Sequence, residues 1–306
     1  MYIIYNFPIA HGRPAQLQQE MVVTDGVERL RGGVAVITGA GSGIGAGLAH
    51  EAAGVGMKVV LADIAEERIH RVAADIEAAG GSALAVPTDV SDPGSLDTLA
   101  AKAYERFGGV RLLVNNAGIE TLGFSWEISA PTWDKTLAIN ISAVVHGVRA
   151  FVPRMIASGS TAFIANMASI GALGVMPVQT SYIMSKHAVL AFSECLRLEM
   201  ALKELPIEVS VILPGPVATR IFADAQANPD PVSVYHREVM QGMLDGSGIS
   251  AREAAARILP QVASGAFWVS THPEMTVEMA KNRANQLAEL AEPRLPPDLR
   301  ASLLSE

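Results

Sequence analysis

Short apolar runs alternate with longer amphipathic segments along most of this chain. The runs are rich in β-branched residues and continuously apolar, as strands buried on both faces of a sheet are. The predicted strands cover residues 34–38, 58–63, 83–90, 111–118, 161–169, 207–216 and 266–270. Helical periodicity follows the first strand as far as Gly54 and then predicts helices over 65–79, 91–107, 130–157, 180–203, 252–262 and 273–291.

Strict alternation of strands and helices predicts a parallel sheet. We therefore expect an α/β fold: a Rossmann-like, doubly wound, parallel seven-stranded sheet in a single domain over 32–292. Residues 217–250 are rich in Pro, Asp, Gly and Met and are predicted to be irregular. They follow the carboxyl end of a strand, where binding loops lie in such sheets, so they are expected to form a substrate lid.

The two ends of the chain fall outside this pattern. Residues 1–31 match no expected element, and 293–306 are expected to be a tail. The first segment is either a flexible arm or the result of an upstream start, in which case Met21 is the natural first residue. Its apolar beginning has no preceding basic residue, as a signal peptide would, and no apolar run approaches the ~18 residues of a membrane span.

Composition narrows the possible partners and the compartment. The net charge is -8 over 306 residues and the basic residues are scattered, which argues against nucleic acid and anionic membranes. Cys195 is the only cysteine, so no intrachain disulfide can form, and a reducing cytoplasm is expected. Its apolar helical context places it in the predicted core. The sequence predicts no metal site.

The stretch TGAGSGIG joins the first predicted strand to the first predicted helix, which is the context of a dinucleotide-binding turn. Gly39 permits the tight turn, Gly43 lets the backbone approach a pyrophosphate, and Gly45 lets the helix pack close to the strand. The helix N-terminus offers free N–H groups and partial positive charge to the phosphates. Ser42 and Ile44, in the same turn, complete the cofactor contacts predicted here.

Asp63 ends the second predicted strand, 18 residues after Gly45. A carboxylate at this place can accept hydrogen bonds from both ribose hydroxyls and repels a 2′-phosphate. Ser42 precedes Gly43 and Ile64 follows Asp63, so neither place offers a cation for NADP. NAD is therefore the predicted cofactor. An alternative that can coexist is that Asp63 caps the helix over 65–79.

Tyr182 and Lys186 stand one helical turn apart on the same face of the helix predicted over 180–203. The simplest interpretation is a surface pair in which the phenol covers the lysine stem. The alternative is a phenol whose pKa is lowered by the ammonium. Moving that pKa from ~10 to ~7 takes roughly 4 kcal/mol. One charge ~5 Å away at an effective dielectric of ~20 supplies roughly 3 kcal/mol, and an oxidised nicotinamide would complete the shift.

Four motifs together resemble those of the short-chain dehydrogenase/reductase family in its common single-domain form. They are TGAGSGIG, NNAG, a serine 13 residues before YxxxK, and PGPVAT, and the resemblance covers about 32–270. It implies that Ser169 polarises the substrate oxygen, that Tyr182 is the acid/base, and that Lys186 grips the nicotinamide ribose. It also implies that Asn140 bends its helix and holds a water in a proton relay.

The resemblance implies a set of NAD contacts as well. These are Asp89 and Val90 at the adenine, Asn116, Ala117 and Gly118 at the adenosine ribose, and Pro214, Gly215, Val217 and Thr219 at the nicotinamide end. The implied activity is hydride transfer between NAD and an alcohol or ketone. An alternative from another class is a non-catalytic NAD-binding regulator. A sugar-nucleotide epimerase or dehydratase would need a larger C-terminal domain than the about 90 residues after the sixth strand.

Three segments are expected to line the substrate pocket: 119–127, 170–178 and 217–225. They carry Leu, Met, Phe, Trp and Val, and their few charges are Glu120, Glu127, Arg220 and Asp224. This composition favours an apolar secondary alcohol or ketone: alicyclic, aryl-alkyl, terpenoid or steroid. Sugar phosphates and acyl-carrier thioesters would require clustered cations. The alternative is that these apolar residues serve only lid and core packing.

The long helices predicted over 130–157 and 180–203 have apolar faces wide enough to serve both the sheet and a partner. Examples are Val144, Val148 and Phe151 on one helix and Val189, Phe192 and Leu196 on the other. Family likeness implies that these helices pair across a two-fold axis, giving a homodimer or homotetramer.

Overall fold

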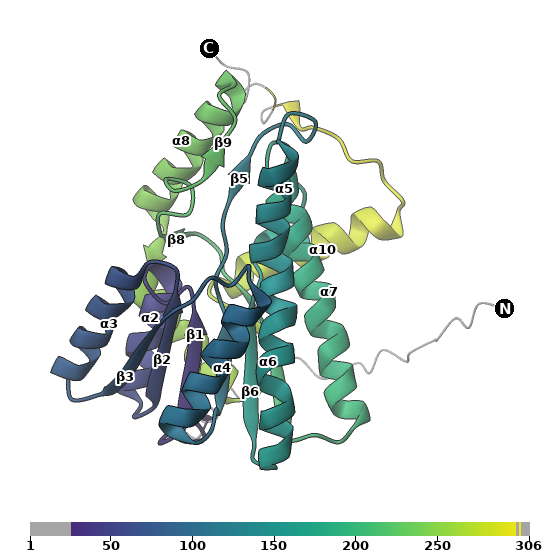
Figure 1. Cartoon of the computed structure of the whole chain (residues 1–306). Helices are drawn as coiled ribbons and strands as arrows, with labels where there is room; N and C mark the ends of the chain where they lie inside the picture. The colour runs from purple at the N-terminus through teal and green to yellow at the C-terminus, as the bar shows by residue number, and fades with distance from the viewer. Residues whose placement is uncertain (1–25, 298–299, 301–306) are drawn as a thin grey trace.

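A seven-stranded parallel sheet forms the centre of the molecule (Figure 1). The structure is a computed structural model and describes residues 26–297 and residue 300. The strand order is β11-β7-β6-β4-β1-β2-β3, with every neighbouring pair parallel. The strands are β1 Val34–Thr38, β2 Lys58–Asp63, β3 Ser82–Pro87, β4 Leu112–Asn115, β6 Ala162–Met167, β7 Ile207–Leu213 and β11 Trp268–Ser270. The predicted doubly wound sheet is confirmed, and its order reverses between β1 and β4, where dinucleotides bind in such folds.

Helices cover both faces of the sheet. They are α2 Gly43–Gly54, α3 Glu66–Ala78, α4 Pro93–Phe107, α5 Ala130–Leu137, α6 Ala143–Ser158, α7 Thr180–Leu202, α8 Pro231–Ser247, α9 Ala251–Ala263 and α10 Pro273–Ala288, with a π-turn η1 Ala138–Ser142 and a 3-10 turn η2 Ile170–Leu173. Strand alternation divides the core: Ala35 and Ile37 point toward α2, α3 and α9, whereas Val34 and Val36 point toward α4, α6 and α7.

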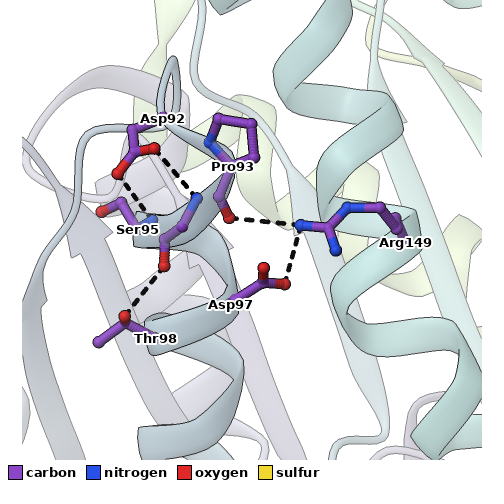
Figure 2. A network of polar contacts seen from close by, with 7 residues as sticks. Asp92, Pro93, Ser95, Asp97, Thr98 and Arg149 are labelled. Atoms are coloured by element: carbon purple, nitrogen blue, oxygen red, sulfur yellow. Dashed lines mark hydrogen bonds and ion pairs between the residues drawn. The ribbon is translucent and has the colours of Figure 1, made fainter.

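The N-terminus of α4 shows how local chemistry fixes one element against another (Figure 2). Asp92 caps the helix by accepting hydrogen bonds from the backbone N–H groups of Gly94 and Ser95, both at 3.0 Å. Arg149 of α6 donates to the Pro93 carbonyl at 3.3 Å and to Asp97 at 2.8 Å. This end of α4 is therefore held against α6, next to the loop that carries Asp89.

The chain between β7 and α9 is more regular than the sequence predicted. The segment 217–250 contains the 17-residue helix α8, so the prediction of an irregular lid is wrong in this part. Asp230 caps α8 by accepting from Ser233 N at 2.9 Å, and Pro231 occupies the first turn. The strand β8 Val217–Ala218 pairs with β10 Ile249–Ser250, and β9 Gln226–Ala227 pairs with β5 Thr121–Leu122.

The folded domain begins earlier than expected. Leu30 is fully buried and Val27 packs against the same core cluster. Arg29 lies over the Phe163 ring, with 4.8 Å between its guanidinium carbon and the ring centroid, and donates to the Ala263 carbonyl. Residues 26–31 thus belong to the domain rather than to an extension. Residues 1–25, which include Met21, lie outside the described residues.

One further prediction about a helix face is wrong, because Cys195 is exposed on α7 rather than buried in the core. The apolar residues expected to serve both the sheet and a partner do pack in the core: Val144, Phe151, Val189 and Leu196 are buried, and Val148 and Phe192 pack against buried clusters. Pairing of these helices with a partner stays a prediction. By length and composition alone, the continuous segment Ala130–Ser158 could cross a membrane. Core helices pass the same test, and this one packs against the sheet.

Candidate active site

The glycine-rich turn has the backbone geometry that a dinucleotide requires. Gly39 and Gly43 have positive φ values of 64° and 53°. At Gly45, a Cβ would lie 2.2 Å from the Gly39 carbonyl oxygen and 2.5 Å from Asn116 Nδ2, so no other residue fits. Ser42 is the extended residue before α2, and the Ile44 side chain packs into the core. The first backbone N–H groups of α2 therefore lie at the end of the glycine-rich turn.

The NNAG turn is bonded directly to the glycine turn. Asn116 Nδ2 donates to the carbonyls of Thr38 and Gly39, at 2.8 and 3.2 Å. Thr38 Oγ1 accepts from the backbone N–H groups of Asn116 and Ala117. The structure thus brings Asn116, Ala117 and Gly39 together as predicted. Thr38 was missed as a site residue, although its place at the end of a strand before the turn is a signal for it.

Asp63 bonds to the turn and to the residue before α3. Its Oδ2 accepts from Gly41 N at 3.0 Å, and its Oδ1 accepts from Ala65 N at 2.9 Å. The alternative that Asp63 caps α3 is wrong, because Ala65 is the N-cap residue and no side chain among the described residues caps the helix. Ile64 is 74% exposed. Arg68, which the sequence analysis overlooked, lies beside the turn, since a Cβ on Gly41 would be 3.0 Å from Arg68 Cβ.

The remaining predicted cofactor residues differ in their exposure and contacts. Asp89 is exposed and accepts from Ser91, whereas the Val90 side chain is buried, so only the Val90 backbone is available to a ligand. Thr219 reaches the glycine turn from the other side, because a Cβ on Gly43 would lie 3.3 Å from its methyl carbon. Val217 is a buried residue of β8.

Pro214 and Gly215 link this region to the catalytic segment. The Pro214 carbonyl accepts from Ile170 N at 3.1 Å, one residue after Ser169. Gly215 N donates to Thr271 Oγ1 at 2.9 Å, and a Cβ on Gly215 would lie 2.5 Å from His272 Nδ1. The close approach of this histidine ring explains the glycine.

Asn140 lies in the π-turn η1 that interrupts the helix between α5 and α6, so the predicted irregularity at this residue is present. Its side chain is buried. Oδ1 accepts from Ile119 N and Nδ2 donates to the Ile119 carbonyl, both at 2.9 Å, and Nδ2 also donates to Ser185 Oγ. Asn140 therefore fixes the residue after the NNAG turn against α7. Its predicted part in a water relay stays a prediction.

Lys186 is buried among the predicted catalytic groups. Its Nζ donates to the Met167 carbonyl at 3.0 Å and lies 5.3 Å from the centroid of the Tyr182 ring. A Cβ on Gly118 would be 3.4 Å from the same Nζ and 3.5 Å from Asn140 Oδ1. Burial lowers the pKa of Lys186 to about 8, and the charge of Glu120 opposes this shift.

The pKa of Tyr182 contradicts the simple Coulomb argument from the sequence. It is raised above its ordinary value, first because of burial and second because of the negative charge of Glu120. The nearby Ser169 hydroxyl acts in the opposite direction and lowers the pKa of Tyr182, so these two predicted catalytic groups lie near each other. Ser169 Oγ also accepts from Gly171 N at 3.0 Å. Tyr182 and Lys186 lie close together as predicted, but the charge of Lys186 alone does not bring the pKa of Tyr182 below its ordinary value.

Glu120 is the functional candidate whose position the sequence analysis did not foresee. It is 2% exposed; one carboxylate oxygen accepts from Thr121 N at 3.1 Å and the other from Gln179 Nε2 at 3.3 Å. Burial raises its pKa well above the usual range, while these two bonds and the charge of Lys186 lower it. The other pocket charges face solvent: Glu127 is exposed, and Arg220 pairs with Asp224 at 2.7 Å on the surface.

Comparison with known proteins identifies the family. The profile described as short chain dehydrogenase matches residues 33–230. The chain belongs to the short-chain dehydrogenase/reductase family. It is therefore an oxidoreductase with the Rossmann-like fold of that family.

Individual members of the family show the extent of the likeness. The chain is 38% identical over 218 residues to 2,5-dichloro-2,5-cyclohexadiene-1,4-diol dehydrogenase LinX of Sphingobium indicum, covering 71% of this chain and 84% of the relative. It is 33% identical over 247 residues to 1-deoxy-11-beta-hydroxypentalenate dehydrogenase of Streptomyces avermitilis, covering 80% and 86%. A short-chain dehydrogenase/reductase of Burkholderia phymatum, solved in complex with NAD, superposes with a TM-score of 0.83 at 34% identity, covering 88% and 98%.

Proposed function

We propose that this short-chain dehydrogenase/reductase is NAD-dependent and interconverts an apolar secondary alcohol and its ketone, with Tyr182 as the acid/base. The observation that carries the proposal is the cluster of Tyr182, Lys186, Asn140 and Ser169 beside the NNAG turn, which is itself bonded to the glycine turn. A non-catalytic regulator would not need a buried lysine beside a tyrosine.

The residues of the turn fit NAD. Gly45 leaves no room for a side chain under the turn, and the start of α2 directs N–H groups toward a pyrophosphate. Asp63 is held at the end of β2, where it would accept from ribose hydroxyls. Bound NAD supplies the carbon that accepts the hydride. The preference for NAD over NADP rests on Asp63, although Arg68 nearby is a cation that the sequence argument did not include.

The chain's own residues account for the proton. In oxidation, the Tyr182 phenolate accepts the proton of the substrate hydroxyl while Ser169 donates a hydrogen bond to the same oxygen. Because burial and Glu120 raise the pKa of Tyr182, the phenolate requires added positive charge, to which the Lys186 ammonium contributes. In reduction, the neutral phenol returns the proton to the substrate oxygen.

The proposed substrate class is a mostly apolar ring or chain that bears a secondary hydroxyl. A small cluster of Leu122, Val178, Phe222, Ala225 and Leu244 joins the lid to the predicted pocket segments. The names of the two relatives, which indicate a cyclohexadiene-diol and a hydroxypentalenate as substrates, support an alicyclic skeleton.

A panel of secondary alcohols tests the proposal. Each alcohol is incubated with enzyme and either NAD or NADP, and reduction is followed at 340 nm. Turnover that disappears in Tyr182→Phe supports the proposed role. Tight NAD binding without turnover of any alcohol or ketone in the panel would instead support the alternative that the protein is a non-catalytic NAD-binding regulator.

A further inference from the structure

The buried face of α8 carries polar atoms that lack a hydrogen-bond partner within the part of the chain that the structure describes. They are Asp230 Oδ2, Ser233 Oγ and His236 Nε2. Ser233 is fully buried and His236 is 4% exposed. Buried polar atoms are nearly always paired, because leaving one without a partner costs free energy. Three on one short stretch therefore indicate a ligand or water that this face receives.

These side chains share one face of the helix. Residues 230, 233 and 236 are spaced by three, which places them on neighbouring turns. Met240 and Leu244 continue the same stripe and pack with Leu122 in the apolar cluster under the lid. The face is thus polar near the start of α8 and apolar toward its end.

Contacts connect the polar end of α8 to the helix that carries Tyr182. Ser181 Oγ donates to the Thr121 carbonyl of β5 at 3.4 Å, and β5 pairs with β9. Asn228 N then donates to the Leu122 carbonyl, two residues before Asp230. Figure 1 shows α8 rising beside β9, with β5 between the lid and α5. The start of α8 is therefore held beside β5, which belongs to one of the predicted pocket segments, and its polar face is buried rather than exposed on the lid.

The chemistry of the three groups selects the ligand. Asp230 Oδ1 already accepts from Ser233 N, so Oδ2 is left as an acceptor. Burial lowers the pKa of His236 and keeps the ring neutral, so that Nε2 can donate or accept. The Ser233 hydroxyl can also do both. A neutral hydroxyl fits this set, whereas the Asp230 carboxylate would repel a phosphate or carboxylate.

We propose that Asp230, Ser233 and His236 bind a second oxygen of the substrate, so that the preferred substrate is a diol or hydroxyketone on an otherwise apolar skeleton. This inference rests on the proposed function, because it requires that the first hydroxyl react at Tyr182. It changes the predicted pocket from a mostly apolar one to an apolar pocket with a defined polar end on α8.

Matched substrate pairs test the proposal: cyclohexanol with cyclohexane-1,4-diol, and 2-octanol with octane-2,7-diol. The unaltered enzyme should have a kcat/KM about tenfold or more higher for the diol in at least one pair, well beyond the factor of two that two equivalent hydroxyls give. Ser233→Ala and His236→Phe should each reduce that diol preference about tenfold. The measured quantity is the ratio of the kcat/KM for the diol to that for the mono-alcohol, which a general loss of activity does not change. Tyr235→Phe is the matched control, since Tyr235 is an exposed residue of the same helix.

The outcomes separate this inference from the proposed function. Oxidation of mono-alcohols without any diol preference, or a preference that neither variant changes, overturns the polar subsite and leaves the proposed function intact. A variant that lowers the melting temperature but keeps the preference shows that ordered water or packing satisfies these atoms, and also overturns it. If His236→Phe fails to fold, the diol preference of the smaller Ser233→Ala variant decides whether the polar subsite exists. Failure of every alcohol to react refutes both.

Discussion

Replacing Lys186 by Met should move the pH dependence of alcohol oxidation upward. The Lys186 ammonium lies 5.3 Å from the Tyr182 ring centroid; Lys186 is buried and Tyr182 is partly buried. Two unit charges at this separation and an effective dielectric of about 20 interact by about 3 kcal/mol. This energy corresponds to about two pH units, by which the phenolate should become harder to form in Lys186→Met at pH values where the ammonium of the unaltered enzyme is charged.

The sign and the pH range follow from the lysine's own titration. The pKa of Lys186 is lowered to about 8, so the ammonium is fully present below that pH and is lost above it. The variant should therefore be slowest relative to the unaltered enzyme below about pH 8, and the two rates should converge as the pH rises. The Kd of NAD should also increase, because the proposed grip on the nicotinamide ribose is removed.

The assay measures kcat for one secondary alcohol from pH 6 to pH 11, together with NAD binding by fluorescence. Lys203→Met is the matched control, because Lys203 is exposed at the end of the same helix and should leave both measurements unchanged. An inflection at the same pH in Lys186→Met and the unaltered enzyme would refute the electrostatic role of the lysine.

Four other predictions concern the same site and the assembly. Tyr182→Phe should lower turnover by about 10²–10⁴ with NAD affinity intact; near-normal turnover would contradict the acid/base role. Asp63→Ala combined with Ser42→Arg should lower the ratio of kcat/KM with NAD to kcat/KM with NADP. An unaltered enzyme that already prefers NADP would show that Asp63 does not determine the cofactor preference. Glu120→Gln should raise the melting temperature at pH 7 but not near pH 4. The pKa of Glu120 is raised in the folded protein, so the unaltered protein loses stability as the pH rises above the pKa that this carboxyl has in the unfolded chain, and the neutral glutamine removes that loss. Equal differences in melting temperature at both pH values would contradict this prediction. Light scattering should report a homodimer or homotetramer, and a monomer at micromolar concentration would overturn that expectation.

The strands and the nucleotide turn were predictable because their constraints are local. A strand buried on both faces must be apolar along its length, so its residues identify it without knowledge of its neighbours. The glycines of the turn are fixed by positive φ at Gly39 and Gly43 and by the close contact at Gly45. Such requirements appear in the sequence as residue types at fixed spacing.

Features decided by distant contacts were not predictable in the same way. Both faces of α7 are apolar, so periodicity could not show that Val189 faces the core while Cys195 faces solvent. The helix α8 was hidden by turn-forming residues, although Asp230 before Pro231 is a helix-start signal that could have revealed it. The pKa of Tyr182 was misjudged because the sequence argument counted one charge and omitted desolvation and Glu120.

The pairing of β8 with β10 makes the lid a segment that can be exchanged for another. These two short strands bring the residues at 217–218 and 249–250 side by side, so the lid segment between them begins and ends at nearly the same point. Among the described residues, those from 219 to 248 contribute to the small cluster with Leu122 and Val178 and to none of the clusters that flank the sheet. The lid sequence, and with it the range of substrates, can therefore change during evolution while the central sheet and the proposed acid/base residues stay the same. Grafting the 220–248 segment between family members, with Thr219 kept at the glycine turn, is the corresponding route for engineering.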